Sequence, residues 1–596
     1  MSLPLNSTNS ALSPLPTSSP RNSQLQLEHV VTEVRETVSE SVLKQEQPPS
    51  TRWRRWLRVF VHHMKKHTGL GAICAVAYFD PGNWSVDLQA GSEYGYKLLF
   101  VVLLAGVMAV VFQAMACRLG CVTGLDLATH CRLLLYNRPK YPRLCRWLLL
   151  YPLYVLCEIA IISTDLAELL GTATALTLLF PKLPLWAGVL ITASDVLVVL
   201  AFSDPTQGRP QRLFELMIAI LVLAVFVSLI VVIVEVNPDW GDTFFGFVPS
   251  NTIIKPGALY TSIGIIGATV MPHGLFLGSS LATQDRVSTF PSNERAGESR
   301  NISLDSLASA NSDKSQHVTT VAAPDKIKEM VSTLRSWRPV GTDRYSKPMP
   351  DENLGHAGWE NNSHSFVLAH LRHGIVDIVF SLLGFAVVIN SLILIIASAV
   401  FYYGPEVTDG SDPADLFQAF NLISQRVGRA SAILFALALL CAGESAGITA
   451  TLAGQIVSEG FLRWSVSPVL RRALTRLIGL IPSMLVAAIL GRSGLNTLLV
   501  ASQVILSFVL PFVSFPLVWI TSSKKLMSVK RNPAEGAVTN DSSSTPEGTQ
   551  SDVEAAKEDM VDYSNGMCVM ILGYAIFFVV LLANVYVLVT LGMGES

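Results

Sequence analysis

Two apolar segments of this chain are each interrupted by a short polar run that contains proline. The first run is Asp80–Asn83 (Asp-Pro-Gly-Asn) and the second is Met271–Gly274 (Met-Pro-His-Gly). In a bilayer every backbone N–H and C=O must be satisfied, so such a break is tolerated only beside a cavity or a site. A carboxylate, an amide and a thioether at two breaks, together with freed carbonyls, can bind a cation. This pattern predicts a secondary transporter for a divalent transition metal.

The ligand types indicate which ions this site would accept. Alkaline-earth ions prefer oxygen ligands, whereas a thioether adds affinity for softer, later ions. We expect a site made of Asp80 Oδ, Asn83 Oδ, Met271 Sδ and one freed carbonyl. Such a site predicts Mn²⁺ or Fe²⁺ as the substrate, with Co²⁺ and Cd²⁺ admitted and Mg²⁺ and Ca²⁺ rejected.

Three acidic residues lie within the third apolar segment, where a charge costs about 2.5–3.5 kcal/mol at the bilayer centre. They are Glu158, Asp165 and Glu168, and their spacings of seven and three place them on one helical face. One interpretation is a static ion-pair network with Arg471 or Arg472. The other is a proton relay, in which the carboxylates exchange protons as their arginine partners move.

His273 lies inside the second break, one residue beyond Pro272. A buried histidine is most often a satisfied part of the core. Beside an unwound helix that holds a metal, gating or proton handling is an equally valid interpretation.

Composition places most of the chain in a lipid bilayer. Of 596 residues, 50% are hydrophobic and only 15% are charged, against about 25% charged in soluble domains. The eight cysteines form no CxxC pair, which argues against a disulfide framework or a zinc site. We find no nucleophile–base arrangement and no phosphate-cradling loop, so we expect no enzyme, no cofactor and no nucleic-acid partner.

Hydropathy predicts about eleven transmembrane spans. Residues 1–66 read as a disordered cytoplasmic tail that ends in a basic juxtamembrane segment, and 285–366 and 523–563 as disordered cytoplasmic loops. The excess of Lys and Arg in alternate loops predicts a cytoplasmic N-terminus. The predicted spans are 69–95 (broken), 97–119, 147–172, 184–203, 213–236, 258–284 (broken), 374–402, 431–457, 473–491, 496–521 and 567–590.

Several motifs, in order, resemble the Nramp family of divalent metal–proton symporters. Residues 77–83 resemble its first-helix motif, residues 268–273 its sixth-helix motif, and residues 451–461 its transport signature. The long inserts make the chain similar to the fungal manganese and iron transporters of that family. Further matches are residues 165–168, Asn390, residues 471–472, residues 502–504 and residues 510–512.

The resemblance implies a fold and a set of roles. The fold is an all-α, LeuT-like membrane protein with two inverted five-helix repeats, here 67–237 and 258–522, followed by an eleventh helix at 567–590. Asp80 would also be the first proton acceptor, passing protons toward the third-span acids and the arginine pair. The implied metal ligands are Asp80, Asn83, Met271 and the Ala268 carbonyl, with Gln503 or the Ala77 carbonyl joining in some conformations; the implied proton pathway is Asp80, Glu158, Asp165, Glu168, His273, Arg471 and Arg472.

One departure from the family pattern is Glu444, which stands where the family has an amide. It is either a satisfied carboxyl in a packed helix or a group that alters the pH dependence of transport. The leading hypothesis is a proton-coupled importer of Mn²⁺ or Fe²⁺ in the plasma membrane or an endosomal or vacuolar membrane. The alternatives are a metal sensor that has lost transport and a magnesium carrier on the same fold.

Overall fold

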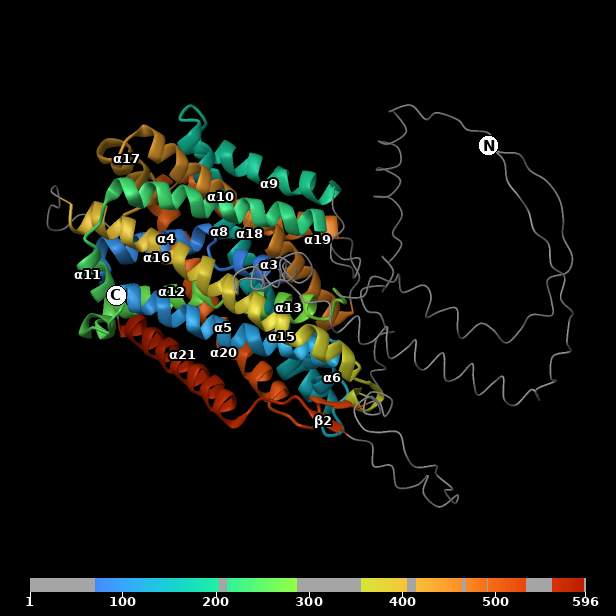
Figure 1. Cartoon of the computed structure of the whole chain (residues 1–596). Coiled ribbons are helices and arrows are strands. Elements are labelled where there is room, and N and C mark those ends of the chain that lie inside the picture. Colours follow the sequence, from blue (N-terminus) through green and yellow to red (C-terminus); the bar gives the residue numbers. More distant parts are fainter. Residues whose placement is uncertain are drawn as a thin grey trace, which may run out of the picture. The chain divides into compact units, whose positions relative to one another are not determined.

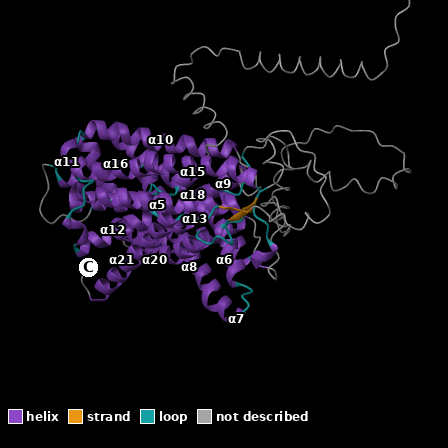
Figure 2. Cartoon of the chain, turned by 60° about the horizontal axis from the view of Figure 1, so that its bottom comes forward, coloured by secondary structure: helices purple, strands orange, loops and turns teal. Residues whose placement is uncertain are grey.

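The computed structural model describes residues 70–202, 212–286, 355–404, 414–463, 468–489, 491–531 and 560–593. The predicted N-terminal tail with its basic segment and most of the two predicted loops lie outside these residues. Within the described ranges the regular secondary structure is helical, apart from one antiparallel pair of three-residue strands, and short loops and turns connect these elements (Figure 2).

The long helices account for every predicted span. Shorter elements connect them: α6 (Leu127–Leu135), α7 (Pro142–Cys145), α11 (Trp240–Phe245), α17 (Leu416–Arg426), β1 (Ser528–Lys530) and β2 (Met560–Asp562). The long helices and half-helices are α3 (Leu70–Val76), α4 (Pro81–Tyr94), α5 (Leu99–Thr123), α8 (Tyr151–Leu179), α9 (Leu185–Phe202), α10 (Arg212–Val236), α12 (Pro256–Thr269), α13 (Pro272–Leu281), α15 (His364–Ser381), α16 (Val387–Ala397), α18 (Arg429–Leu462), α19 (Pro468–Ile489), α20 (Gly491–Thr521) and α21 (Met567–Met593).

Eight segments of the described chain are long and apolar enough to cross a membrane. One of them, Pro81–Thr123, contains parts of two predicted spans, because a single turn of 3₁₀ helix (Gly95–Leu98) joins α4 to α5. The eight do not include α9 or α19, although both are helices where spans were predicted.

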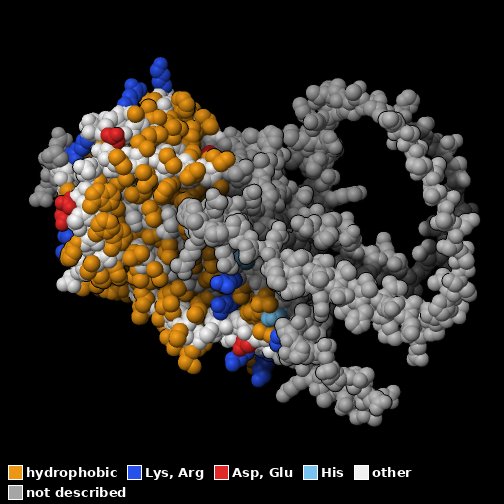
Figure 3. Space-filling view, in the orientation of Figure 1, with side chains coloured by type: hydrophobic (Ala, Val, Ile, Leu, Met, Phe, Trp, Pro, Cys, Tyr) orange, Lys and Arg blue, Asp and Glu red, His pale blue; other side chains and the backbone are white. Residues whose placement is uncertain are grey.

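Apolar side chains cover most of the described surface seen in Figure 3, and charged side chains gather toward its margins. In α10 and α21 large apolar residues such as Val234 and Leu582 are more than two-thirds exposed. In the view of Figure 1, α9 and α21 lie toward opposite edges of the bundle, with α3, α4, α12 and α13 between them. Outward-facing apolar helices around buried half-helices are the arrangement expected of a protein that lies in lipid.

Both predicted helix breaks are present. Pro81 and Pro272 are the first residues of α4 and α13, a position where the missing N–H of proline costs nothing. The preceding residues take extended backbone conformations, with ψ of 168° at Asp80 and 124° at Met271. Proline disfavours the helical conformation of the residue before it, so each break lies where the sequence places it.

The first break is held from three sides. The Asn390 side chain on α16 donates from Nδ2 to the carbonyl of Tyr78 at 2.8 Å, which satisfies a backbone group freed by the break. A methyl group added at Gly171 of α8 would overlap Pro81, and one at Gly443 of α18 would lie 3.3 Å from Pro81 Cγ. Small residues on α8 and α18 therefore allow the break to approach both helices closely.

The ends of the two predicted loops are more ordered than we expected. The seventh span begins at His364 and not at 374, because Ser363 caps α15 by accepting a hydrogen bond from the Phe366 N–H. Residues 355–363, predicted to be disordered, pack against the end of α5: Trp359 Nε1 donates to the Thr123 carbonyl at 2.7 Å, and Asn362 Nδ2 to the Cys121 carbonyl at 2.9 Å. The 523–563 loop likewise begins and ends in the strand pair β1–β2.

Candidate metal site

Asp80 is the N-cap of α4 and is fully buried. Its Oδ1 accepts hydrogen bonds from the Asn83 backbone N–H at 2.8 Å and from Asn83 Nδ2 at 2.9 Å. The start of a helix also places a partial positive charge beside this carboxyl group. The break thus fixes Asp80 and Asn83 side by side, as the sequence predicted.

The two breaks meet through Asn83. Its Nδ2 also donates to the carbonyl of Ala268 on α12 at 3.1 Å, although 185 residues separate the two positions. Ala268 lies in the last turn of α12, where carbonyls have no partner within the helix. In this arrangement Asn83 Nδ2 faces both Asp80 Oδ1 and the Ala268 carbonyl oxygen. Asn83 Oδ1 can act as the predicted metal ligand only after the side-chain amide makes a half-turn.

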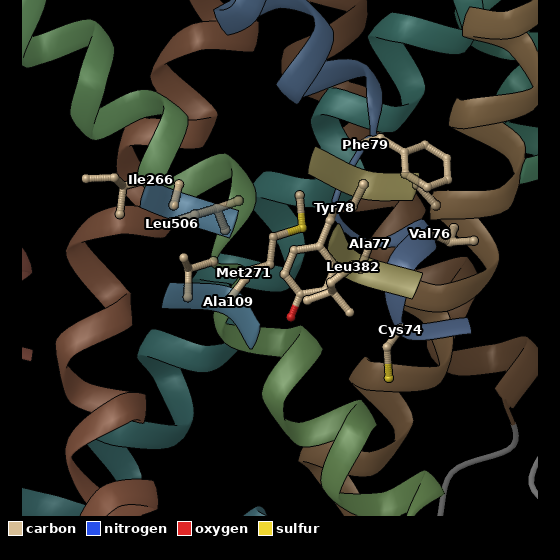
Figure 4. Close-up of a cluster of buried hydrophobic side chains, with 14 of the residues drawn as sticks. Cys74, Val76, Ala77, Tyr78, Phe79, Ala109, Ile266, Met271, Leu382 and Leu506 are labelled. Carbon is tan, nitrogen blue, oxygen red and sulfur yellow. The ribbon is translucent and has the colours of Figure 1, made fainter. Parts of the chain in front are cut away.

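Met271 and Ala77 complete the buried surroundings of the two breaks. Both are at most 2% exposed, and Figure 4 shows the Met271 thioether beside the Tyr78 ring, with Ala77 next to Tyr78 on the segment that leaves α3. The Met271 sulfur therefore comes from the second break and Ala77 from the first. The residue types indicated Met271 as a ligand, whereas only the family resemblance implied Ala77.

Gln503 on α20 lies against the first break. A methyl group added at Gly82 would overlap the Gln503 amide, so only glycine lets this side chain approach the backbone so closely. Gln503 Nε2 donates to Ser502 Oγ at 3.1 Å, and the whole residue is buried. The structure thus brings Gln503 to the first break, as the family resemblance implied.

Several buried oxygen atoms around the breaks have no hydrogen-bond partner among the described residues. They are Asp80 Oδ2, Thr269 Oγ1, Asn390 Oδ1 and Gln503 Oε1. A buried acceptor without a partner is costly, and native proteins seldom keep several of them together unless a ligand or water satisfies them. A cluster of acceptors that includes a carboxylate, next to a thioether, suits a divalent cation.

The predicted proton-pathway residues divide into two groups. Asp165 and Glu168 on α8 are fully buried, whereas Glu158, one end of the same predicted face, is only partly buried. His273 on α13 is buried, and its Nδ1 lies 3.4 Å from Thr164 Oγ1, next to Asp165 in sequence. The second break and the third-span acids are therefore neighbours.

Arg476 is the arginine that the structure places beside these acids. Its Nη2 lies 3.8 Å from Glu168 Oε2, and its Nη1 donates to the Asp165 carbonyl at 3.4 Å. Sequence reasoning singled out Arg471 and Arg472, which lie on α19 but whose side chains are outside the described part. Arg476 follows Arg472 by one helical turn, and an arginine inside an apolar helix was the signal that would have found it.

Glu444 on α18 is half-buried. Its neighbour Gly443 is the residue that approaches Pro81. The effect of this departure on proton handling stays a prediction.

The fold and site together define a multi-pass helical membrane protein with a cation-suited site at two broken helices. A protein-family model described as "Natural resistance-associated macrophage protein-like", abbreviated Nramp, matches residues 71–313 and 351–538. The chain belongs to this family. The all-α, LeuT-like fold expected from the resemblance is thereby confirmed.

Relatives and solved structures agree with this assignment. The manganese transporter pdt1 of Schizosaccharomyces pombe is 40% identical over 533 residues, covering 89% of this chain and 86% of its own. The iron transporter SMF3 of Saccharomyces cerevisiae is 38% identical, covering 78% of this chain and 83% of its own. A crystal structure of the Eremococcus coleocola manganese transporter matches with a TM-score of 0.61 at 27% identity, covering 91% of this chain and 88% of that one.

Proposed function

We propose that this protein imports divalent transition-metal ions, Mn²⁺ or Fe²⁺, toward the cytosol together with protons, by alternating access. The single observation that carries the proposal is the meeting of the two breaks, where Asn83 joins Asp80 to the Ala268 carbonyl among unsatisfied buried oxygens. Relatives that cover most of the chain are named as manganese and iron transporters, which favours these two ions.

The donor set accounts for the expected selectivity. Asp80 supplies a charge and hard oxygen, and Met271 supplies a sulfur that Mg²⁺ and Ca²⁺ do not favour. Amide and backbone oxygens from Asn83, Gln503, Ala268 and Ala77 complete the shell in one conformation or another. The ligands are few and mostly weak, so the ion can be released again, which a transporter requires. Co²⁺ and Cd²⁺ are then further substrates.

Proton coupling follows the line of buried polar groups from the site to α19. Asp80 accepts a proton when the metal leaves, and His273 stands at the second break, next to Thr164. Asp165 and Glu168 continue the line to Arg476, whose Nη2 lies 3.8 Å from Glu168 Oε2. Glu158, Arg471 and Arg472 would extend it toward the cytoplasmic side.

Orientation and location complete the proposal. The excess of Lys and Arg in alternate loops favours a cytoplasmic N-terminus. The protein would then reside in the plasma membrane or an endosomal or vacuolar membrane, where import delivers metal to the cytosol. No catalytic role is proposed.

Proteoliposomes containing the full-length protein test this function. Mn²⁺ uptake should rise when the outside is acidified, and Asp80→Asn should abolish it. Asp126→Asn is a matched control, because Asp126 is also a buried N-cap aspartate but caps α6, away from the breaks. Uptake that persists in Asp80→Asn would refute the site.

The same assay separates the alternatives. A metal sensor would bind Mn²⁺ without measurable flux. A magnesium carrier would show Mg²⁺ outcompeting Mn²⁺.

A further inference from the structure

Three cysteines line one stretch of the described interior, between the metal site and one face of the membrane. Gln113, Cys117 and Cys121 follow one another at intervals of four on α5, so they share a helical face. The Gln113 amide Nε2 lies 3.0 Å from Cys74 Sγ on α3 and donates to it, and Gln113 Oε1 accepts a hydrogen bond from the Tyr78 hydroxyl at 3.2 Å. Tyr78 lies beside Met271, and Figure 4 shows Cys74 further along α3 from them.

This line of residues ends at a cavity of about 20 Å³. A cavity of about 10–15 Å³ by this measure holds one water, so there is room for one small ion. Its lining includes Leu70 at the start of α3, Cys117 and Cys121 on α5, Arg286 beyond the end of α13, and His370 on α15. A methyl group added at Gly374 would lie 2.9 Å from Cys117 Sγ, so α15 packs directly on the thiol.

The cavity lies at the end of the bundle where α3 begins and α13 ends. Helix α3 begins at Leu70, α13 ends at Leu281 and α15 begins at His364, and Leu70, Leu281 and His370 all line the cavity. If the N-terminus is cytoplasmic, as the charge distribution predicts, an ion that leaves the site past α3 and α13 passes these sulfurs on its way to the cytosol.

Thiols are soft ligands and bind Cd²⁺ far better than Mn²⁺. The described residues contain no group of three or more His, Cys, Asp and Glu that forms a ready metal site, so these thiols make no static trap. The His370 ring is already engaged, because its Nε2 accepts the Arg286 N–H at 3.1 Å and lies 3.2 Å from Asp285 Oδ1. The two α5 thiols are therefore the sulfur donors that face the cavity.

We propose that Cys117 and Cys121, with Cys74 nearer the site, form a soft-ligand station on the exit route, which binds thiophilic divalent cations such as Cd²⁺ and passes Mn²⁺. This inference rests on the proposed function, since it assumes that metal leaves past α3. When Cd²⁺ enters as cargo and binds there, Cd–S bonds form and the cysteine thiols release their protons to solvent. The ion then leaves more slowly than Mn²⁺. The station thus adds a second separation of hard from soft cargo, by release rate, to the selection that the Met271 thioether makes at the cargo site.

Cd²⁺ alone, titrated into purified full-length protein, is the direct probe. Cd²⁺ bound to thiolates gives an ultraviolet charge-transfer band, and the cargo site contributes none because it holds no thiol. We expect a band that Cys117→Ser/Cys121→Ser removes or shifts to Cd²⁺ concentrations about tenfold or more higher, since even outer-shell changes cost about 10–100-fold in metal affinity. Cys441→Ser/Cys568→Ser is the matched control, because both thiols lie on other helices, α18 and α21, and its band should persist.

Two further measurements keep the result clear. Cys117→Ala/Cys121→Ala replaces the serines if the hydroxyls prevent folding, and it should lose the band as well. Mn²⁺ uptake in proteoliposomes is measured for each variant and should stay near wild type. If the serine and alanine variants of Cys117 and Cys121 both keep normal Mn²⁺ uptake and an unchanged Cd²⁺ band, the soft-ligand station is overturned and the proposed function is unaffected. Absence of Mn²⁺ uptake in the wild type would instead count against the proposed function.

Discussion

Replacing Arg476 by methionine tests the buried charge pair most directly. Arg476 is 5% exposed and Glu168 is fully buried, and their closest atoms are 3.8 Å apart. At an effective dielectric constant of about 20, a pair at this distance gains about 4 kcal/mol from Coulomb attraction. Removing one partner of a buried pair costs about 3–5 kcal/mol, because the remaining charge is left in a medium that solvates it poorly. We therefore expect Arg476→Met to lower stability by about 3–5 kcal/mol at neutral pH.

A double-mutant cycle separates the charge effect from packing. Glu168→Gln removes the buried charge, so the double variant Arg476→Met/Glu168→Gln should recover most of the loss, with a coupling energy of about 2 kcal/mol or more. The assay is thermal or denaturant unfolding of the purified protein in one detergent, with Mn²⁺ uptake against pH measured alongside. Equal destabilisation in the single Arg476 variant and in the double variant would refute the charge pair. A single variant as stable as wild type would do so too.

Three further predictions concern other parts of the molecule. Met271→Ala should weaken competition by Cd²⁺ for Mn²⁺ uptake and let Mg²⁺ or Ca²⁺ compete, because the sulfur ligand is lost; unchanged competition would contradict the role of the thioether. Gly82→Ala should cost about 1–3 kcal/mol in an unfolding assay because its methyl group overlaps Gln503. Gly384→Ala, a helical position with no atom within 4 Å, should instead leave stability unchanged or raise it by up to about 1 kcal/mol. Burial lowers the pKa of His356 to about 4, whereas the pKa of a histidine in an unfolded chain is about 6.5. The segment 355–363 should therefore loosen as the pH falls from about 6.5 toward 4, and should stay in place above that window. The rate of proteolysis in this segment, measured against pH, tests the prediction, and His356→Gln should make that rate nearly independent of pH.

The sequence was most informative where its chemistry is local. Pro81 and Pro272 fix the places of both breaks, because proline acts on its own residue and the one before it. The ligand types could also be read directly, since lipid makes every polar group at membrane depth exceptional. Bringing Asn83 to Ala268, however, is a contact between residues 185 positions apart. Only the family resemblance, and not the spacing, implied that contact.

Other features could not be predicted because they also depend on contacts between residues far apart in the sequence. Arg476 was passed over in favour of Arg471 and Arg472, because spacing along α19 does not say which of its faces meets α8. The ordered ends of the predicted loops were missed because polar composition predicts disorder. In the structure those polar side chains have backbone partners on other elements, such as Asn361 Nδ2, which donates to the Leu526 and Ser528 carbonyls.

The hydrogen bonds that hold both ends of the first long loop have a consequence for how the sequence of this loop can change in evolution. On one side the backbone of Arg286 is tied to His370 on α15, and on the other Trp359 and Asn362 are tied to the end of α5. The family pattern itself has no match between residues 313 and 351. The entropic cost of joining two fixed ends grows slowly with the length of the connecting chain, by about 0.6 kcal/mol for each doubling. The intervening stretch can therefore grow, shrink or acquire new sequence in evolution while the two breaks keep their geometry, and it is the natural place to graft a reporter.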